Sequence, residues 1–243
     1  MATTTRKPRT APGKIATVKA ATVKTAAVRK SAARSKADAA PYHHGDLHEA
    51  LLVAAERVLE RDGLPGLTLR AAAREAGVSH AAPTHHFGDL TGLLSELAAI
   101  GFRRFHAAMT SGAGKVTAPS ERLDAMGSAY VAFAQRHPGL FRLMFRSERL
   151  DMDQPALSEA MNAAGTALAQ AVGARRHETI VREKPSLAQA ADIVRAWSMV
   201  HGFATLLLDG RLDEMLSMLP PGETAESLLT AMLTPPKGTG GHC

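Results

Sequence analysis

The sequence lacks the features of secreted and membrane-spanning proteins. Its 243 residues include one cysteine, Cys243, so no disulfide can form within the chain. A reducing cytoplasm is therefore the expected location. No apolar run approaches the roughly 18 residues that a membrane-spanning helix needs. The N-terminal residues also lack the apolar segment of a secretory signal. We expect a cytoplasmic protein without membrane contact.

Common catalytic signatures are also missing. The sequence contains no G-x-S-x-G nucleophile motif, no H-E-x-x-H metal motif and no G-x-G-x-x-G dinucleotide fingerprint. On a helix the adjacent pairs His43-His44 and His85-His86 cannot share one metal ion, because neighbouring residues point about 100° apart. We expect no catalytic residue, no cofactor and no metal site.

Aromatic residues are scarce, and helix-forming residues are common. Only 4% of the residues are aromatic, whereas 45% are hydrophobic. Alanine, the strongest helix former, is abundant. Hydrophobic residues recur mainly at steps of three and four, which is the period of an amphipathic helix. The sequence predicts an all-α fold of one large or two modest domains.

Positive charge is concentrated near the N-terminus. Residues 1–41 contain ten Lys and Arg and one Asp, whereas the whole chain carries +6, so residues 42–243 sum to −3. Five basic residues from Lys14 to Arg34 recur at every fifth position and would spiral around a helix axis. We interpret residues 1–41 as a disordered Ala/Lys-rich basic arm that binds DNA phosphates, with a solvated leader as the alternative. Residues 235–243 are expected to be a flexible tail.

The most informative segment is LTLRAAAREAGVSHAAPTHHF, residues 67–87. Thr68 is a candidate N-cap of a short helix, and Gly77 can take the left-handed conformation that ends it. Ser79 is a candidate N-cap of a second helix. Two short helices around a glycine turn are typical of a DNA-binding helix-turn-helix. An ordinary helical hairpin in an all-α core fits the same spacing.

Three stretches between Tyr42 and Phe105 carry a family resemblance. They read YHHGDLHEALLVAAERVLERDG, LTLRAAAREAGVSHAAPTHHFGD and LLSELAAIGFRRF, in order and without gaps. This segment resembles the N-terminal domain of the TetR/AcrR family of transcriptional regulators. The resemblance implies a helix-turn-helix domain over residues 42–104, with helices at about 46–62, 68–76, 80–87 and 89–109. The third helix would enter the DNA major groove.

The resemblance also implies which residues contact DNA. They lie at the start of the second helix and along the third: Thr68, Arg70, Ser79, His80, Ala81, Ala82, Pro83, Thr84, His85 and His86. The family usually has tyrosine at the position of Thr84 and often lysine at that of Leu90. Both family residues commonly contact phosphate, so the resemblance does not imply a phosphate contact at Thr84 or Leu90.

A second resemblance lies in the C-terminal half. The segments WSMVHG, residues 197–202, and HPGLFRLMF, residues 137–145, are similar to the WHG-type C-terminal domain of TetR-like regulators. They imply a ligand-binding and dimerisation domain over residues 105–234. Further helices are predicted after an N-cap at Ser120, from Pro138, over 154–175, along the stripe at 187–208 and over about 223–233. By analogy with the family, residues 192–208 and 223–233 would form the contact of a homodimer, where Gly202 and Ala204 would permit close helix approach.

The apolar stripe of the helix predicted over residues 187–208 indicates which of its side chains are buried. Its members recur at steps of three and four: Leu187, Ala190, Val194, Trp197, His201, Ala204 and Leu208. The remaining helices should enclose a cavity for a small apolar effector. The candidate lining residues are Phe102, Phe105, Met109, Tyr130, Phe133, Phe141, Met144, Phe145, Met161, Trp197 and His201. For each of these residues, a plain core position fits the same pattern.

These features predict a sequence-specific transcriptional regulator. It would be a repressor that binds a pseudo-palindromic operator in double-stranded DNA as a nucleoid-associated homodimer and leaves it when a small molecule binds. The alternative is a nucleoid-type architectural protein whose DNA binding depends mainly on the basic arm.

Overall fold

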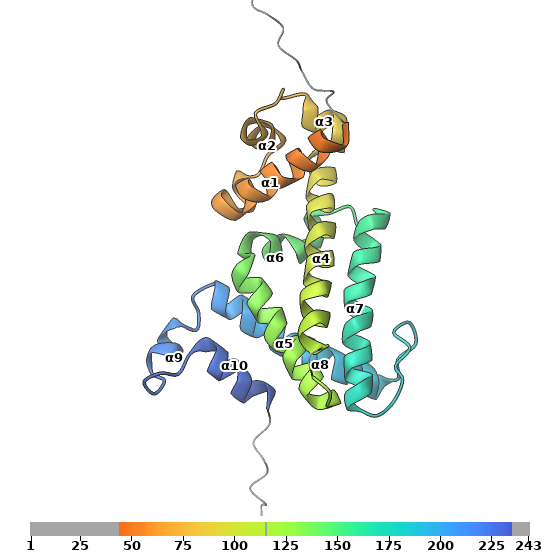
Figure 1. The fold of residues 1–243 in the computed structure, drawn as a ribbon, viewed down its shortest axis with the longest axis vertical. Helices are drawn as coiled ribbons and strands as arrows, with labels where there is room; N and C mark the ends of the chain where they lie inside the picture. The colour runs from red at the N-terminus through yellow and green to blue at the C-terminus, as the bar shows by residue number, and fades with distance from the viewer. Residues whose placement is uncertain (1–43, 115, 235–243) are drawn as a thin grey trace, which may run out of the picture. The chain divides into compact units, whose positions relative to one another are not determined.

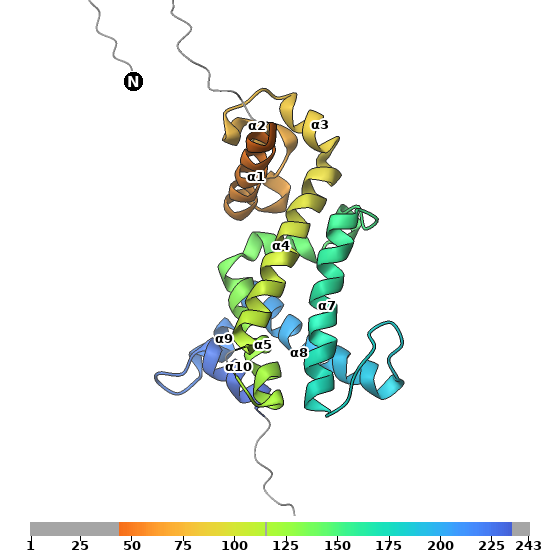
Figure 2. The same cartoon turned by 45° about the vertical axis from the view of Figure 1, so that its right-hand side comes forward.

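The computed structural model describes residues 44–114 and 116–234, and these residues form an all-α fold. The predicted basic arm and C-terminal tail lie outside the described residues. In chain order the elements are α1 (His44–Gly66), α2 (Leu69–Ala76), α3 (Ala82–Phe87), α4 (Leu90–Ala113), α5 (Pro119–Arg136), α6 (Pro138–Met144), the 3₁₀ turn η1 (Ser147–Arg149), α7 (Pro155–Arg175), α8 (Leu187–Leu208), α9 (Asp213–Ser217) and α10 (Ala225–Leu233) (Figure 1; Figure 2). In the described part of the chain, no helix is both long and apolar enough to span a bilayer.

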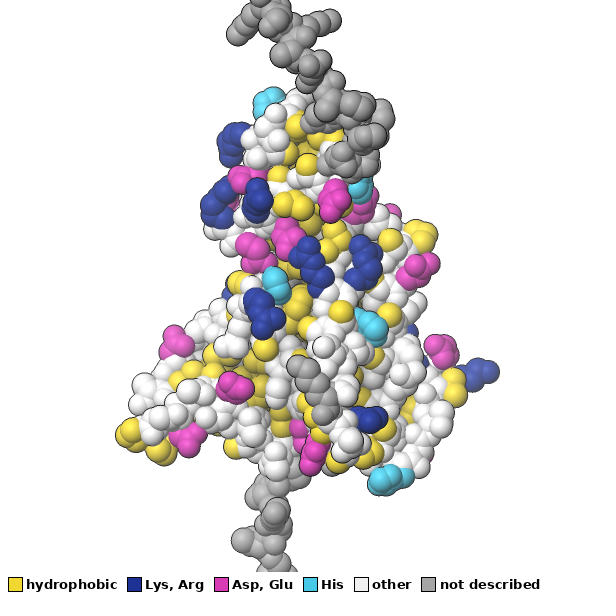
Figure 3. Space-filling view, viewed as in Figure 1, with side chains coloured by type: hydrophobic (Ala, Val, Ile, Leu, Met, Phe, Trp, Pro, Cys, Tyr) yellow, Lys and Arg dark blue, Asp and Glu magenta, His cyan; other side chains and the backbone are white. Residues whose placement is uncertain are grey.

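Glycine conformations and one side-chain cap set the end of α1 and both ends of α2. Gly63 breaks α1 with a φ of +70°, which glycine adopts without steric cost, so the regular helix ends at the predicted residue 62. Thr68 Oγ1 accepts a hydrogen bond from the Ala71 N–H at 3.0 Å, which confirms the predicted N-cap of α2. Gly77 has a φ of +69° and ends α2 as predicted. Basic and acidic side chains are interspersed around α1 and α2 (Figure 3).

Two predicted N-caps are wrong. Helix α3 begins at Ala82, and Ser79 Oγ accepts from the Ala81 N–H at 3.3 Å in the turn before the helix. Helix α5 begins at Pro119 after Ala118, because the fixed φ of proline suits the first helical position. Ser120 therefore lies within the first turn.

Two other helices differ from the prediction. Helix α4 continues to Ala113, four residues beyond the predicted residue 109. The Thr110 hydroxyl donates to the His106 carbonyl at 2.8 Å in this extra turn. The short helix α9 was not predicted, because five residues are too few to show a helical period.

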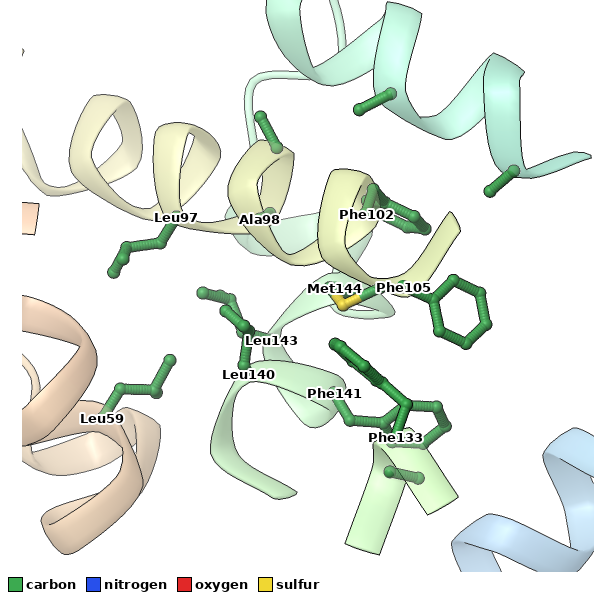
Figure 4. Close-up of a cluster of buried hydrophobic side chains, with 14 of the residues drawn as sticks. Leu59, Leu97, Ala98, Phe102, Phe105, Phe133, Leu140, Phe141, Leu143 and Met144 are labelled. Atoms are coloured by element: carbon green, nitrogen blue, oxygen red, sulfur yellow. The ribbon is translucent and has the colours of Figure 1, made fainter. Parts of the chain in front are cut away.

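One hydrophobic core extends from the N-terminal helices into the C-terminal bundle. Helix α6 contacts both α1 and α4, and α4 also packs against α5 and α7. Leu59 of α1, Leu97 of α4 and Leu143 of α6 are buried in the same cluster, and Figure 4 shows their side chains between the three helices. Helix α6 therefore shares one packed core with α1 and α4.

The buried face of α8 differs from the predicted one. Val200, Phe203 and Ala204 are buried, whereas Leu187 is 88% exposed and Trp197 is 43% exposed. Of the predicted stripe only Ala204 is fully buried. The predicted helix is present, but α8 has two apolar faces. Packing within one chain buries the face that carries Val200 and Phe203, and not the predicted stripe.

Candidate functional site

The residues predicted to contact DNA are mostly accessible. Seven of the ten are exposed: Thr68, Arg70, Ser79, His80, Ala81, Thr84 and His85. Ala82 and His86 are half-buried. Pro83 is fully buried, so its side chain helps to position α3, and a DNA contact at this residue stays a prediction.

Contacts with α1 and α4 fix the orientation of α3. Phe87 is buried at the end of α3, and its ring centroid lies 4.8 Å from that of His48. His48 in turn lies 2.9 Å from a carboxylate oxygen of Glu96 on α4. Because this side of α3 is held in the core, Thr84 and His85 face solvent from a rigid support.

The charges around α2 largely neutralise one another. Arg61 lies 3.0 Å from carboxylate oxygens of both Asp62 and Glu75. The hydrogen bond to Asp62, followed by that to Glu75, raises the pKa of Arg61 above its ordinary value. Arg70 has no ion pair within residues 44–114 and 116–234 and is therefore available to a phosphate.

A cavity of about 780 Å³ lies among α4, α5, α6, α7 and α8. Eight of the predicted ligand residues line it: Phe102, Phe105, Met109, Tyr130, Met144, Phe145, Met161 and Trp197. This volume falls in the usual range of small-molecule sites, roughly 300–1,000 Å³. Most of its lining is apolar, as expected for a small apolar effector.

Three predicted ligand residues lie outside this lining. Phe133 packs in the core, with its ring centroid 5.3 Å from that of Phe105. Phe141 and His201 instead line a smaller hollow of about 230 Å³ beside Arg142. Helical spacing identified all three as inward-facing, but it does not distinguish a cavity wall from the packed core behind it.

The charged part of the cavity wall was missed by sequence reasoning. It comprises Asp124, Arg175, Arg176, Arg182, Asp192 and Arg195. A search for apolar residues at helical spacing does not identify charged residues, such as arginines at helix ends. Four arginines between residues 175 and 195 were the signal that could have found this wall.

A polar cluster lies where the cavity meets the core. Tyr130 Oη and His201 Nδ1 are 2.7 Å apart, and Trp197 Nε1 donates to the same hydroxyl at 3.4 Å. Burial raises the pKa of Tyr130 and lowers the pKa of His201. His201 is therefore a half-buried, hydrogen-bonded histidine, and its contact with a ligand stays a prediction.

Helix α6 connects the cavity to the N-terminal helices. The Glu60 carboxylate of α1 accepts hydrogen bonds from the backbone N–H groups of Gly139 at 2.8 Å and Leu140 at 3.0 Å. These N–H groups lie in the first turn of α6, where a helix has unpaired donors. At the other end of α6, Met144 lines the cavity.

Comparison with protein families gives two matches in the predicted order. Residues 51–97 match the tetR family of bacterial regulatory proteins, and residues 123–232 match the tetracyclin repressor-like C-terminal domain. The WHG subtype stays a prediction. No curated protein matches the chain.

Solved structures agree with this assignment. A protein of unknown function from Rhodococcus sp. RHA1 is 37% identical, with a TM-score of 0.63, and the match covers 79% of this chain and 94% of that one. FadR from Bacillus subtilis, in complex with stearoyl-CoA, is 16% identical with a TM-score of 0.57, and the match covers 76% and 95% of the two chains. The TetR-family regulator PfmR from Thermus thermophilus is 19% identical with a TM-score of 0.51, covering 75% and 94%. The last two show the fold alone. The chain belongs to the TetR family of bacterial regulatory proteins, with a helix-turn-helix N-terminal domain and a TetR-type C-terminal domain.

Proposed function

We propose that the protein is a repressor whose DNA binding is released by a small molecule. The observation that carries this proposal is the link through α6. The first turn of α6 is capped by Glu60 of α1, and Met144 at the other end lines the cavity. A ligand that moves Met144 would move α6 and, through Glu60, the helix on which α2 and α3 pack.

The DNA-reading part of the proposal rests on α3. Thr84 and His85 are exposed on a helix whose other side is anchored by Pro83 and Phe87. Exposed polar side chains on such a helix can reach base edges in the major groove. Arg70 and the basic arm would supply phosphate contacts.

A homodimer would place two such helices on one operator. The surface of α8 presents Val194 and Leu206, which are 54% and 46% exposed, and α10 adds the exposed Met232. Gly202 lies on α8 with nothing within 4 Å of the position a Cβ would take, so a second helix has room to approach there. Ala204 is buried within one chain and takes no part in this surface, contrary to the role predicted for it.

Selection of bound sequences from random DNA, followed by footprinting, tests the function. We expect a short inverted repeat with half-sites about 10–10.5 base pairs apart, or a multiple of that spacing. Uniform protection without a preferred sequence would instead support the architectural alternative. Because chromosomal DNA is the partner, the proposed site of action is the cytoplasm.

A separate variant tests the dimer. Gly202→Leu adds a side chain that points into open space in a single chain, so the fold should tolerate it. In the proposed dimer this side chain would meet the partner helix. Sedimentation velocity should show a dimer for the unaltered protein and a shift toward monomer for the variant. A monomeric unaltered protein would contradict the proposed two-fold operator complex.

A further inference from the structure

Charged residues line one part of the otherwise apolar cavity. They come from the start of α5, the end of α7, the α7–α8 connection and the first turns of α8. Four arginines face two aspartates in this lining, so the cavity wall has a net positive charge. The aromatic and methionine residues come mainly from α4, α5 and α8, with Met144 on α6 and Met161 on α7.

Three of the four arginines already have acidic partners. Arg175 lies 2.7 Å from an Asp124 carboxylate oxygen. Arg176 pairs with Glu178 and Asp192, and Arg195 pairs with Asp192. These pairs hold the wall together and leave little attraction for a further anion.

Arg182 is different. Its Nη1 donates to the amide oxygen of Asn162 at 2.9 Å, and in the described part of the chain no carboxylate lies within ion-pair distance of it. A guanidinium presents several N–H donors in a planar fork that matches a carboxylate or phosphate. Arg182 therefore offers the cavity an anion-binding group whose charge no carboxylate neutralises.

A glycine on α7 makes room for this guanidinium. A Cβ at Gly165 would lie 2.7 Å from Arg182 Nε and 3.0 Å from its Cζ. Gly165 lies inside α7, where glycine stabilises a helix less than alanine does. The missing side chain lets Arg182 lie flat against the helix at the cavity wall.

We propose that the cavity binds an amphiphilic anion, with its hydrocarbon chain among Phe102, Phe105 and Met161 and its carboxylate or phosphate on Arg182. This inference names the effector class of the regulator proposed above, and it rests on that function only for its effect on DNA. A ligand with only an apolar chain would give the Arg182 guanidinium no anionic partner. A small inorganic anion would not fill the apolar part of the cavity.

Binding is measured with the full-length protein and three probes of one chain length. Dodecanoate and dodecan-1-ol share a tail and differ in the anionic head, and dodecanoyl-CoA carries phosphates instead of the free carboxylate. The fluorescence of Trp197 reports binding, because it is the only tryptophan and lines the cavity. Dodecanoate should bind at least about tenfold more tightly than dodecan-1-ol, as expected for a hydrogen-bonded charge pair. Shortening the acid should weaken binding roughly fourfold per methylene removed.

Two variants and a control identify the anion-binding group. Arg182→Gln should remove the preference for dodecanoate over dodecan-1-ol. Lys184→Gln removes the same charge from the same connection outside the cavity lining, and it should keep the preference. Gly165→Ala should also reduce the preference by displacing the guanidinium, and it should not weaken the fold, because alanine is the better helix former.

The outcomes separate this inference from the proposed function. Tighter binding of dodecanoyl-CoA that also depends on Arg182 would identify a phosphate as the natural head and support the inference. Equal binding of acid and alcohol, a preference that survives Arg182→Gln, or no binding of any probe would overturn it. DNA binding is measured separately, without any probe. Absence of DNA binding would contradict the proposed regulator but would not contradict the inferred ligand site.

Discussion

The contact between Glu60 and α6 gives a prediction about both stability and ligand response. Glu60→Gln removes the negative charge and replaces one acceptor oxygen with an N–H₂ donor. One of the backbone N–H groups of Gly139 and Leu140 then loses its acceptor. Each such hydrogen bond to a charged group contributes about 1.5–3 kcal/mol, and the charge at the helix N-terminus contributes about 0.3–1 kcal/mol. Because Glu60 is only half-buried, we expect a loss near the lower end, about 2 kcal/mol.

Thermal unfolding measures the first effect. A loss of about 2 kcal/mol should lower Tm by roughly 4–8 °C in a chain of this size. Glu49→Gln is the matched control, because Glu49 is exposed on the same helix and has no ion pair in the described part of the chain. The control should change Tm by less than about 2 °C.

Operator release measures the second effect. The Glu60→Gln protein should still bind operator DNA, since α2 and α3 are unchanged, but a cavity ligand such as dodecanoate should release it less effectively. The Glu49→Gln protein should release normally. A Glu60→Gln protein with unaltered Tm and unaltered release would refute the reasoning that α6 transmits the signal through this contact.

Three further predictions concern other parts of the molecule. His85→Ala should weaken operator binding by about 1–3 kcal/mol and leave binding to random DNA unchanged; an electrophoretic shift with equal loss on both would make His85 a phosphate contact. Deletion of residues 1–40 should weaken binding to operator and random DNA by similar factors and flatten the log–log salt dependence by roughly 0.9 per lost phosphate contact; an unchanged slope would mean that the arm does not touch DNA. Burial lowers the pKa of His201, so the unfolded chain takes up this proton more readily, and stability should fall as the pH drops below about 6.5. Melts at about pH 5.5 and pH 7.5 should show a smaller difference for His201→Asn than for the unaltered protein, and an equal difference would contradict this cause.

Local chemistry in the sequence determined much of the N-terminal domain. The Thr68 cap and the left-handed Gly77 depend on a few neighbouring residues, so both could be predicted without a structure. The family resemblance rested on three longer stretches between Tyr42 and Phe105. Where Ser79 and Ser120 failed as caps, the helix still began within three positions of the predicted cap.

Tertiary packing decided the features that join distant parts of the chain. Only the folded chain shows which apolar face of α8 is buried, because both faces have the same period. Glu60 reaches the N–H of Gly139, 79 residues away, and Arg182 lies against Gly165 on a different element. Neither contact has a signature in residue spacing, because each depends on how helices pack. The sequence by itself therefore determined the helices and the DNA-binding motif, while packing decided the cavity, its charged wall and its connection to α1.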